Sequence, residues 1–301
     1  MSNELFTPFR WRNFLDSVLG GGQANDSLWR GQECPDWGLV AGFDRELARV
    51  HKQSVNDREA KFNKRLAEYK RLTAALNTKD ESSPRSSIVN LELSGQHQGL
   101  RTRLLDWSES PFVAVFFAFA RFVEQGFGSE SIRQVLHRQS DRCVAVWQLM
   151  RTEELPETIK VIRDYPSSGY RQRAQLGAFT RIVGGTTVDL SVALPVVIKD
   201  NGLGSAPKIP LGSCLVKWQL LASDFAVAFD DLRSMGINYS LLFPDEYGAA
   251  MQVNLTQGIS NLAGITRIRD KIESDEALLR RIAEIVPECT KKPGDAECDE
   301  L

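Results

Sequence analysis

The sequence predicts an α+β fold, built on a mixed, mostly antiparallel β core with helices at the front, centre and end of the chain. Many short, β-rich apolar runs are separated by turn residues, which is typical of an antiparallel sheet. One run, residues 111–123, is apolar nearly all round and predicts a buried helix. The strands do not alternate regularly with helices, so a doubly wound parallel sheet is not expected.

The composition is that of a soluble globular protein. The chain has 301 residues, of which 42% are hydrophobic and 25% are charged. With a formal net charge of −2, the chain is not expected to bind nucleic acid or an anionic membrane electrostatically over a broad surface. The cysteines are dispersed without a CxxC pair and the histidines lie far apart, so no metal site is expected. Because we find no signal peptide and no apolar run of roughly 20 residues, we expect a cytoplasmic protein.

The N-terminal third is predicted to contain a short amphipathic helix, a strand and a long charged helical segment. Residues 1–26 hold the first helix and a glycine-rich loop, and SLWRGQ (27–32) is a strand that ends in a turn. Residues 44–77 form the long segment, with Asp44 as its N-cap. Its apolar stripe weakens between 51 and 61, where a break in the helix is expected.

The central region is predicted to be mainly β-structure around the buried helix. A strand over 102–107 leads into the helix, for which Ser108 or Ser110 is the N-cap and Pro111 the first residue. Capping does not explain Thr102, Arg103 and Asp106, which lie further upstream. Their side chains are therefore expected to bind one another inside the protein or to form a polar site. Further strands are expected at 142–149, 160–165, 177–183, 195–200 and 213–220.

The C-terminal region is predicted to contain a short helix, a strand and turn, and a final helix. Ser223 is the expected N-cap of the helix over 223–236, and residues 238–248 have the pattern of a strand followed by a turn. A helix is expected from about 264 to 286, followed by a polar tail. The chain is accordingly divided into an N-terminal helix and loop (1–26), a central domain (27–253), and a C-terminal helix and tail (254–301).

The role of Arg30, at the end of the first strand, has two possible interpretations. It can pair with Asp106 or a backbone carbonyl, or its planar fork can bind phosphate. Gln175, beside a glycine, can bind a ligand or satisfy the edge of a sheet. The adjacent acids of FPDEYG (243–248) are typical of a turn, and a site at this place is the alternative.

Four segments together resemble the FRG domain family, which is named for a Phe-Arg-Gly motif. Here the motif is WRGQ (29–32), with Trp in place of the usual Phe. QHQGLRTRLLDWSESPFVAVFFA (96–118) is similar to the most distinctive block of the family. AQLGAFT (174–180) and MGINYSLLFPDEYG (235–248) resemble two later blocks, so the resemblance covers about 27–250.

The order of these parts is similar to that of ADP-ribosyltransferases, which implies a split sheet and NAD as substrate. The resemblance implies that Arg30 holds the pyrophosphate and that Ser108 or Thr102 positions the nicotinamide ribose. Gln175 stands where an acid is normally needed, so Asp106 or Glu246 is the alternative. The implied catalytic residues are Arg30, His97, Asp106, Ser108 and Gln175, and the implied NAD-binding residues are Arg30, Gly31, Gln32, Thr102, Arg103 and Trp107.

Three functions therefore remain open. The first is an ADP-ribosyltransferase-like enzyme, which the resemblance places among bacterial toxins or phage-defence effectors that modify a nucleic acid or a protein. The second is a non-catalytic nucleotide or nucleic-acid binding module, in which His97, Arg101, Arg103 and Trp107 form a patch for charge and stacking. The third is an interaction partner, such as one half of a toxin–antitoxin or defence pair, supported by the charged segment 44–77.

Overall fold

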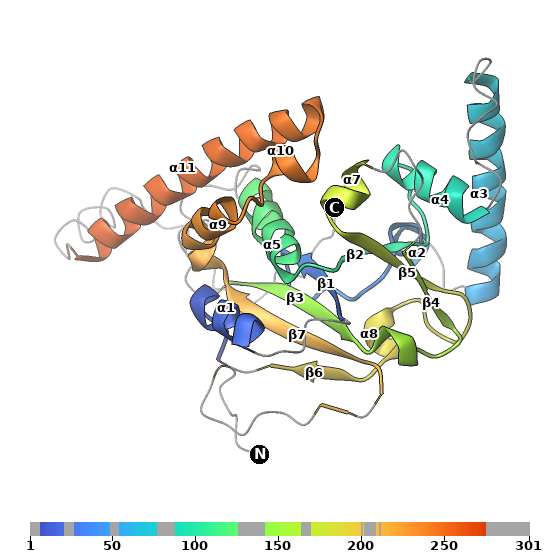
Figure 1. Ribbon diagram of the computed structural model, residues 1–301, viewed down its shortest axis with the longest axis horizontal. Helices are drawn as coiled ribbons and strands as arrows, with labels where there is room; N and C mark the ends of the chain where they lie inside the picture. The colour runs from blue at the N-terminus through green and yellow to red at the C-terminus, as the bar shows by residue number, and fades with distance from the viewer. Residues whose placement is uncertain are drawn as a thin grey trace, which may run out of the picture.

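The computed structural model describes residues 7–20, 27–48, 54–76, 88–125, 142–163, 170–199, 201, 209–210 and 212–274. Within them lies a seven-stranded sheet with the order β4-β5-β2-β1-β3-β7-β6, which curls into a half-barrel (Figure 1). All neighbouring strands are antiparallel except β6 and β7, so the α+β prediction with a mixed, mostly antiparallel core is confirmed. The strands are β1 (Ser27–Gln32), β2 (Leu105–Ser108), β3 (Cys143–Met150), β4 (Ile159–Ile162), β5 (Gly177–Ile182), β6 (Val196–Ile198) and β7 (Cys214–Leu221).

The pairing between β1 and β2 is the shortest in the sheet. These strands are paired only at Trp29 and Ser108, whereas β1 pairs with β3 from Ser27 to Gln32. On its other side β2 pairs with β5 along its whole length. Two blocks of strands therefore meet at one position and then separate, which leaves an opening at the end of β1.

Helix α5 (Pro111–Gln125) is buried against β1, as its sequence predicted. A Cβ atom on Gly31 would lie 1.9 Å from the main-chain oxygen of Ala114, so only glycine permits this approach. Ser110 Oγ accepts from Val113 N at 3.4 Å and is thus the N-cap, while Ser108 Oγ accepts from Ser110 N at 3.0 Å. Around α5 pack α1 (Trp11–Gly20), α9 (Phe225–Ser234) and α11 (Glu246–Ser274), which close the main hydrophobic core on this face of the sheet.

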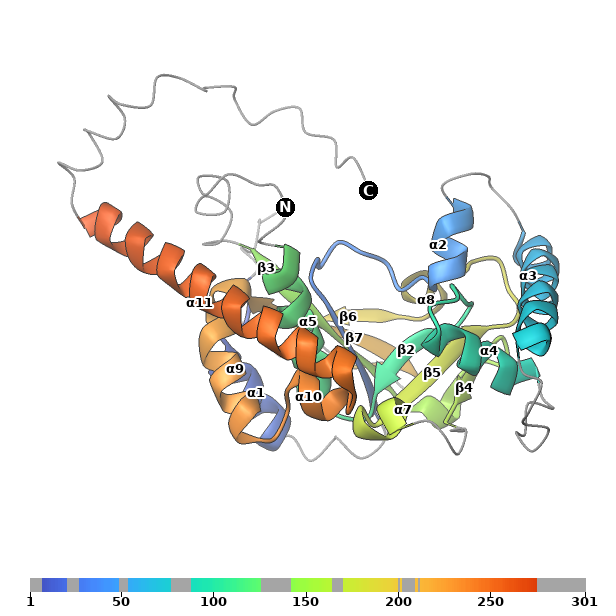
Figure 2. The same cartoon turned by 90° about the horizontal axis from the view of Figure 1, so that it is seen from above.

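The long helical segment consists of separate helices at the edge of the sheet. α2 (Gly42–Ala48) and α3 (Val55–Leu76) replace the expected segment 44–77, and Asp44 lies inside α2 instead of capping it. A third helix, α4 (Ile88–His97), was not predicted, because its weak apolar periodicity gave no clear signal. All three helices lie at the end of the molecule farthest from α9 and α11 (Figure 2).

Two of the predicted strands differ from the structure. The strand over 102–107 begins only at Leu105, so Thr102 and Arg103 belong to a loop. The strand and turn over 238–248 are α10 (Tyr239–Leu242) and the start of α11, because Asn238 Oδ1 accepts from Leu241 N and Asp245 Oδ1 accepts from Gly248 N.

The C-terminal helix begins earlier than the sequence indicated. α11 starts at Glu246 and runs through the boundary placed at 253–254 to Ser274, and the predictions for residues 275–301 lie outside the described residues. Ser223 is not the cap of α9, since it lies in a 3-10 turn (Ala222–Asp224) that precedes the helix. Among the described helices, none is both long and apolar enough to cross a membrane.

Candidate functional site

A cleft of about 980 Å³ opens where β1 and β2 separate. This volume is at the upper end of the roughly 300–1,000 Å³ of small-molecule sites. Its walls come from β1, β2, α5, the turn before β5, and the segment that joins α10 to α11. Among the sequence-predicted site residues, Arg30, Gly31, Gln32, Asp106, Trp107, Ser108 and Gln175 line this cleft.

Arg30 is held across the opening between the two strands. Its Nη1 donates to the main-chain oxygen of Asp106 at 2.8 Å and lies 3.8 Å from Asp106 Oδ2. Burial lowers the pKa of the Arg30 guanidinium, and the Asp106 carboxylate opposes this shift. Within the described part of the chain, Arg30 Nε and the neighbouring Trp29 Nε1 are buried without a hydrogen-bond partner. Such buried donors are costly, because no partner replaces the water that they lose on folding.

Asp106 is positioned by Gln96, a residue of α4 that sequence reasoning did not select. Gln96 Nε2 donates to Asp106 Oδ1 at 2.5 Å, and Gln96 Oε1 accepts from the hydroxyl of Thr102. The Asp106 side chain remains 61% exposed. Thr102 is buried behind this contact and acts on the site through Gln96, so its expected place in the NAD-binding set is not supported. Gln96 is the first residue of the 96–118 block, which was the only sequence signal for it.

Ser108 and Gln175 join the two walls of the cleft. Ser108 Oγ donates to the main-chain oxygen of Gln175 at 2.7 Å, and Gln175 Nε2 donates to Leu242 O at 3.1 Å. Both side chains are therefore used in holding the turn before β5 against β2 and α10. Since Ser108 Oγ also accepts from Ser110 N, its hydroxyl is a positioning group in this structure.

Gln32 and Trp107 also support the cleft through hydrogen bonds to the sheet and its loops. Gln32 Nε2 donates to Gly38 O at 3.1 Å, and its Oε1 accepts from Trp147 Nε1 at 2.7 Å. Trp107 Nε1 donates to Thr180 Oγ1 at 2.8 Å. The polar groups of both side chains thus form hydrogen bonds within the protein. Only the rest of each side chain contributes to the wall of the cleft.

The rim of the cleft is formed by Arg171 and the 243–248 segment. Arg171 Nη2 lies 2.6 Å from Asp245 Oδ2, and its guanidinium lies over the rings of Phe243 and Tyr247. The N–H of Gly248 and the Arg171 guanidinium hold the pKa of Asp245 below its usual range. Asp245 is thus a helix cap, and Glu246 is not among the described residues that line the cleft.

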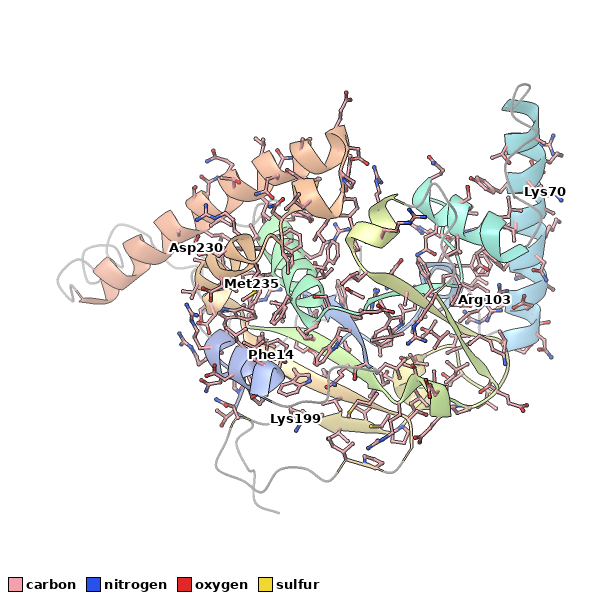
Figure 3. The ribbon with its side chains drawn as sticks, in the orientation of Figure 1. Phe14, Lys70, Arg103, Lys199, Asp230 and Met235 are labelled. Atoms are coloured by element: carbon pink, nitrogen blue, oxygen red, sulfur yellow. The ribbon has the colours of Figure 1, made fainter. Side chains whose placement is uncertain are left out.

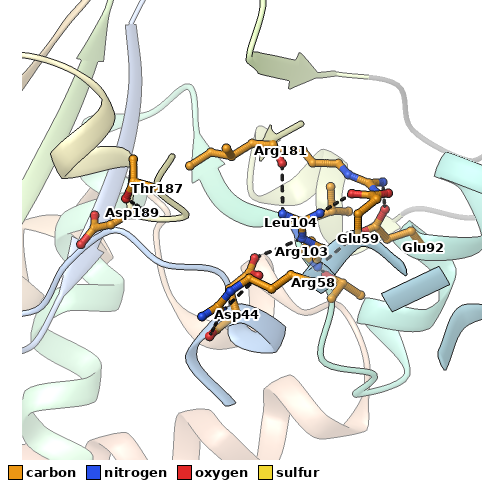
Figure 4. Close-up of polar contacts among 11 residues, drawn as sticks. Asp44, Arg58, Glu59, Glu92, Arg103, Leu104, Arg181, Thr187 and Asp189 are labelled. Carbon is orange, nitrogen blue, oxygen red and sulfur yellow. Dashed lines mark hydrogen bonds and ion pairs between the residues drawn. The ribbon is translucent and has the colours of Figure 1, made fainter. Parts of the chain in front are cut away.

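Arg103 lies outside the cleft, contrary to its expected role in NAD binding. Its side chain is 1% exposed and contacts Asp44 Oδ2 at 3.3 Å and Glu59 Oε2 (Figure 4). Figure 3 shows Arg103 on the side of the molecule that faces α3. The network that surrounds it contains three acids and three arginines, namely Asp44, Glu59, Glu92, Arg58, Arg103 and Arg181. These ion pairs attach α2, α3 and α4 to β5, so Arg103 serves the fold.

His97 is the last residue of α4, and its side chain lies outside the described residues. The cleft also contains cations and rings that the sequence did not single out. They are Trp37, Arg45, Phe117, Arg121 and Phe179. Phe117 and Phe179 lie within the 96–118 and 174–180 blocks, but the sequence does not show that the fold brings all five side chains to one cleft. Within the described residues, no group of His, Cys, Asp and Glu side chains could hold a metal ion.

The fold and the cleft define an α+β protein with a ligand-sized site beside a curled seven-stranded sheet. Residues 25–125 match the family model of the FRG domain, and the chain therefore carries an FRG domain. This range contributes β1, β2, α5 and the helices between them, including Arg30 and Asp106. No curated protein and no solved structure matches the chain significantly.

Proposed function

We propose that the cleft binds NAD and that the protein is an ADP-ribosyltransferase-like enzyme. The observation that carries this proposal is Arg30, whose guanidinium lines the cleft at the opening between β1 and β2 and lies 3.8 Å from the Asp106 carboxylate. A planar fork in such a place is suited to a diphosphate. The separation of β1 from β2 also agrees with the split sheet that the resemblance implies.

The other residues of the cleft suit a dinucleotide. Arg45 adds positive charge for phosphate groups, while Trp37 and Phe117 offer rings to a base or to nicotinamide. A volume of about 980 Å³ accommodates a ligand of this size. The same lining contains several carboxylates, so its positive charge is local and favours a ligand whose anionic part is confined to one segment.

Asp106 is the carboxylate that fits the chemistry best. Transfer breaks the bond between nicotinamide and C1′ of the ribose, and nicotinamide leaves as a neutral molecule with the bonding electrons. The ribose then carries a developing positive charge, which a nearby carboxylate stabilises. An acceptor nucleophile forms the new bond to C1′ and gives up its proton to a base. Asp106 is exposed to the cleft, and Gln96 orients it, whereas the Gln175 amide is already bonded to Leu242.

Two measurements on the full chain test the proposal: NAD binding by calorimetry and release of labelled nicotinamide. We expect Asp106→Asn to keep binding within about threefold and to lower release by about 100-fold or more, as for loss of one electrostatic stabiliser. Arg12→Lys, on the exposed surface of α1, is the matched control and should change neither. If wild-type protein neither binds NAD nor releases nicotinamide, the proposal fails. Binding without release would favour the non-catalytic nucleotide-binding module.

We further propose that the enzyme acts as a toxin or phage-defence effector with a cognate partner, which is the setting that the family resemblance implies. Induced expression in a bacterial host should then inhibit growth, and Asp106→Asn should relieve the inhibition at equal protein levels. Equal toxicity of the two proteins would contradict this setting. Co-purification with the product of a neighbouring gene would identify the partner.

A further inference from the structure

A second hollow, of about 650 Å³, lies beside the cleft on the surface of α3. It is formed by one face of this helix and by the loop that follows α4. Gly99 lines both the hollow and the cleft, so the two meet at this loop. A Cβ atom built on Gly99 would meet no atom within 4 Å, which shows that the space here is open. The hollow, called the α3 groove below, is lined by Lys61, Lys64, Arg65, Glu68, Tyr69, Leu72, Gly99, Leu100 and Arg101.

The α3 groove carries cations around a mainly apolar lining. Four of its side chains are cations and one is a carboxylate, and Arg65 and Arg101 both contact Glu46, so Lys61 and Lys64 supply the positive charge that is left for a ligand. Lys64 and Arg65 lie on the same face of α3 as Lys61, because they are three and four positions beyond it. Lys61 and Lys64 are exposed, and no ion pair to either is found in the described portion of the chain. A polyanion can therefore bind to them without breaking an existing contact.

The α3 groove also contains apolar and aromatic surface. Tyr69 and Leu100 are partly buried against the small cluster that includes Phe62 and Leu66, and Leu72 is 50% exposed. A positively charged groove combined with an aromatic side chain is the arrangement that holds single-stranded nucleic acid, since phosphates contact the cations and bases stack on the ring. An acidic peptide would match the cations but would leave the ring without a specific partner.

We propose that the α3 groove binds the phosphate backbone of a single-stranded nucleic acid and leads one nucleotide past Gly99 into the cleft. The proposal that nucleic acid binds depends only on the lining of the α3 groove. The further step, that this nucleic acid is the acceptor of ADP-ribose, rests on the proposed function.

The test uses the full chain without NAD and fluorescent single-stranded DNA and RNA of about 12 nucleotides, within the range of known binding grooves. Anisotropy measured over a salt series gives the affinity and its salt dependence. In the double variant Lys61→Ala/Lys64→Ala we expect about tenfold weaker binding, because two phosphate contacts are lost. The slope of log affinity against log salt should fall by roughly 1.4, at about 0.7 for each contact to a single strand.

The matched control is Arg12→Ala/Arg233→Ala, which removes two positive charges from α1 and α9, at the opposite end of the molecule from α3 (Figure 1). It should bind like wild type. The proposal is overturned if wild type does not bind, if the two double variants lose affinity equally, or if poly-glutamate of the same charge binds as tightly with the same dependence on Lys61 and Lys64. Nicotinamide release is measured separately, so failure of the groove and failure of the NAD proposal are distinguishable.

Discussion

Arg30 and Asp106 face each other across the opening between β1 and β2, and the contact is made mainly through the backbone. Arg30 Nη1 donates to the main-chain oxygen of Asp106 at 2.8 Å, whereas the carboxylate oxygen lies 3.8 Å away. The guanidinium is thereby fixed in place without close pairing to the Asp106 carboxylate. Both charged groups line the cleft, which makes Arg30 the first residue to test.

Arg30→Lys should lose nucleotide binding while keeping the fold. Lysine retains the positive charge but lacks the planar fork, so it cannot bind a diphosphate in a bidentate manner. We expect NAD affinity to fall by about tenfold or more, measured by calorimetry. The melting temperature without ligand should change by only a few degrees. Unchanged NAD affinity would show that the guanidinium does not contact the ligand.

Arg103→Ala should strongly destabilise the protein, and Arg101→Ala should not. The Arg103 side chain is 1% exposed, and its loss would remove one of the two arginines that contact each of Asp44 and Glu59, a cost of about 3–5 kcal/mol for a broken buried network. Arg101 is 64% exposed and makes one 3.4 Å contact to Glu46, which is worth about 0–1 kcal/mol. Urea unfolding of the two variants measures both free energies. Similar losses would contradict the structural role assigned to Arg103.

Glu92 should make stability fall as pH rises. Its burial raises the pKa of the carboxyl to about 7, although Arg181 opposes the shift. In the unfolded chain this pKa is about 4.3, so the folded state binds an additional proton between these values. The resulting stabilisation is complete below the unfolded pKa and is lost as pH rises through the folded pKa.

Glu92→Gln removes this titration. The free energy of unfolding of wild type should therefore decline relative to the variant by up to about 3 kcal/mol between pH 4.5 and 7.5. Urea unfolding of both proteins at several pH values measures the difference. Parallel curves over this range would show that the folded pKa of Glu92 is not raised.

Gly31→Ala should disrupt the packing of α5 on β1. The new Cβ would lie 1.9 Å from Ala114 O, and backbone must move to relieve that contact, so we expect a loss of about 3 kcal/mol or more. Gly264→Ala is the control, because a Cβ there meets no atom within 4 Å in helix α11. It should stabilise the protein by about 0.5–1 kcal/mol. Thermal unfolding compares the two, and equal effects would contradict the close approach at Gly31.

Local sequence patterns predicted the strands and the central helix well. The alternating residues of β3 and β7 and the apolar run of α5 encode their own conformation, because burial selects side chains with the period of the element. The same reasoning failed at α4 and at residues 238–248. At residues 238–248, the helix caps Asn238 and Asp245 outweigh the β-propensity of the neighbouring residues.

For the candidate site, the sequence by itself determined which segments carry unusual polar residues, and it selected Arg30 and Asp106. Only the tertiary structure decided which of Arg30 and Arg103 faces the cleft. Arg30 and Arg103 are both charged residues beside apolar strands, yet Arg103 meets acids from α2 and α3 and is withdrawn into a buried network. Partners that lie far apart in the chain are brought together by the pairing of strands, and no local pattern records that pairing.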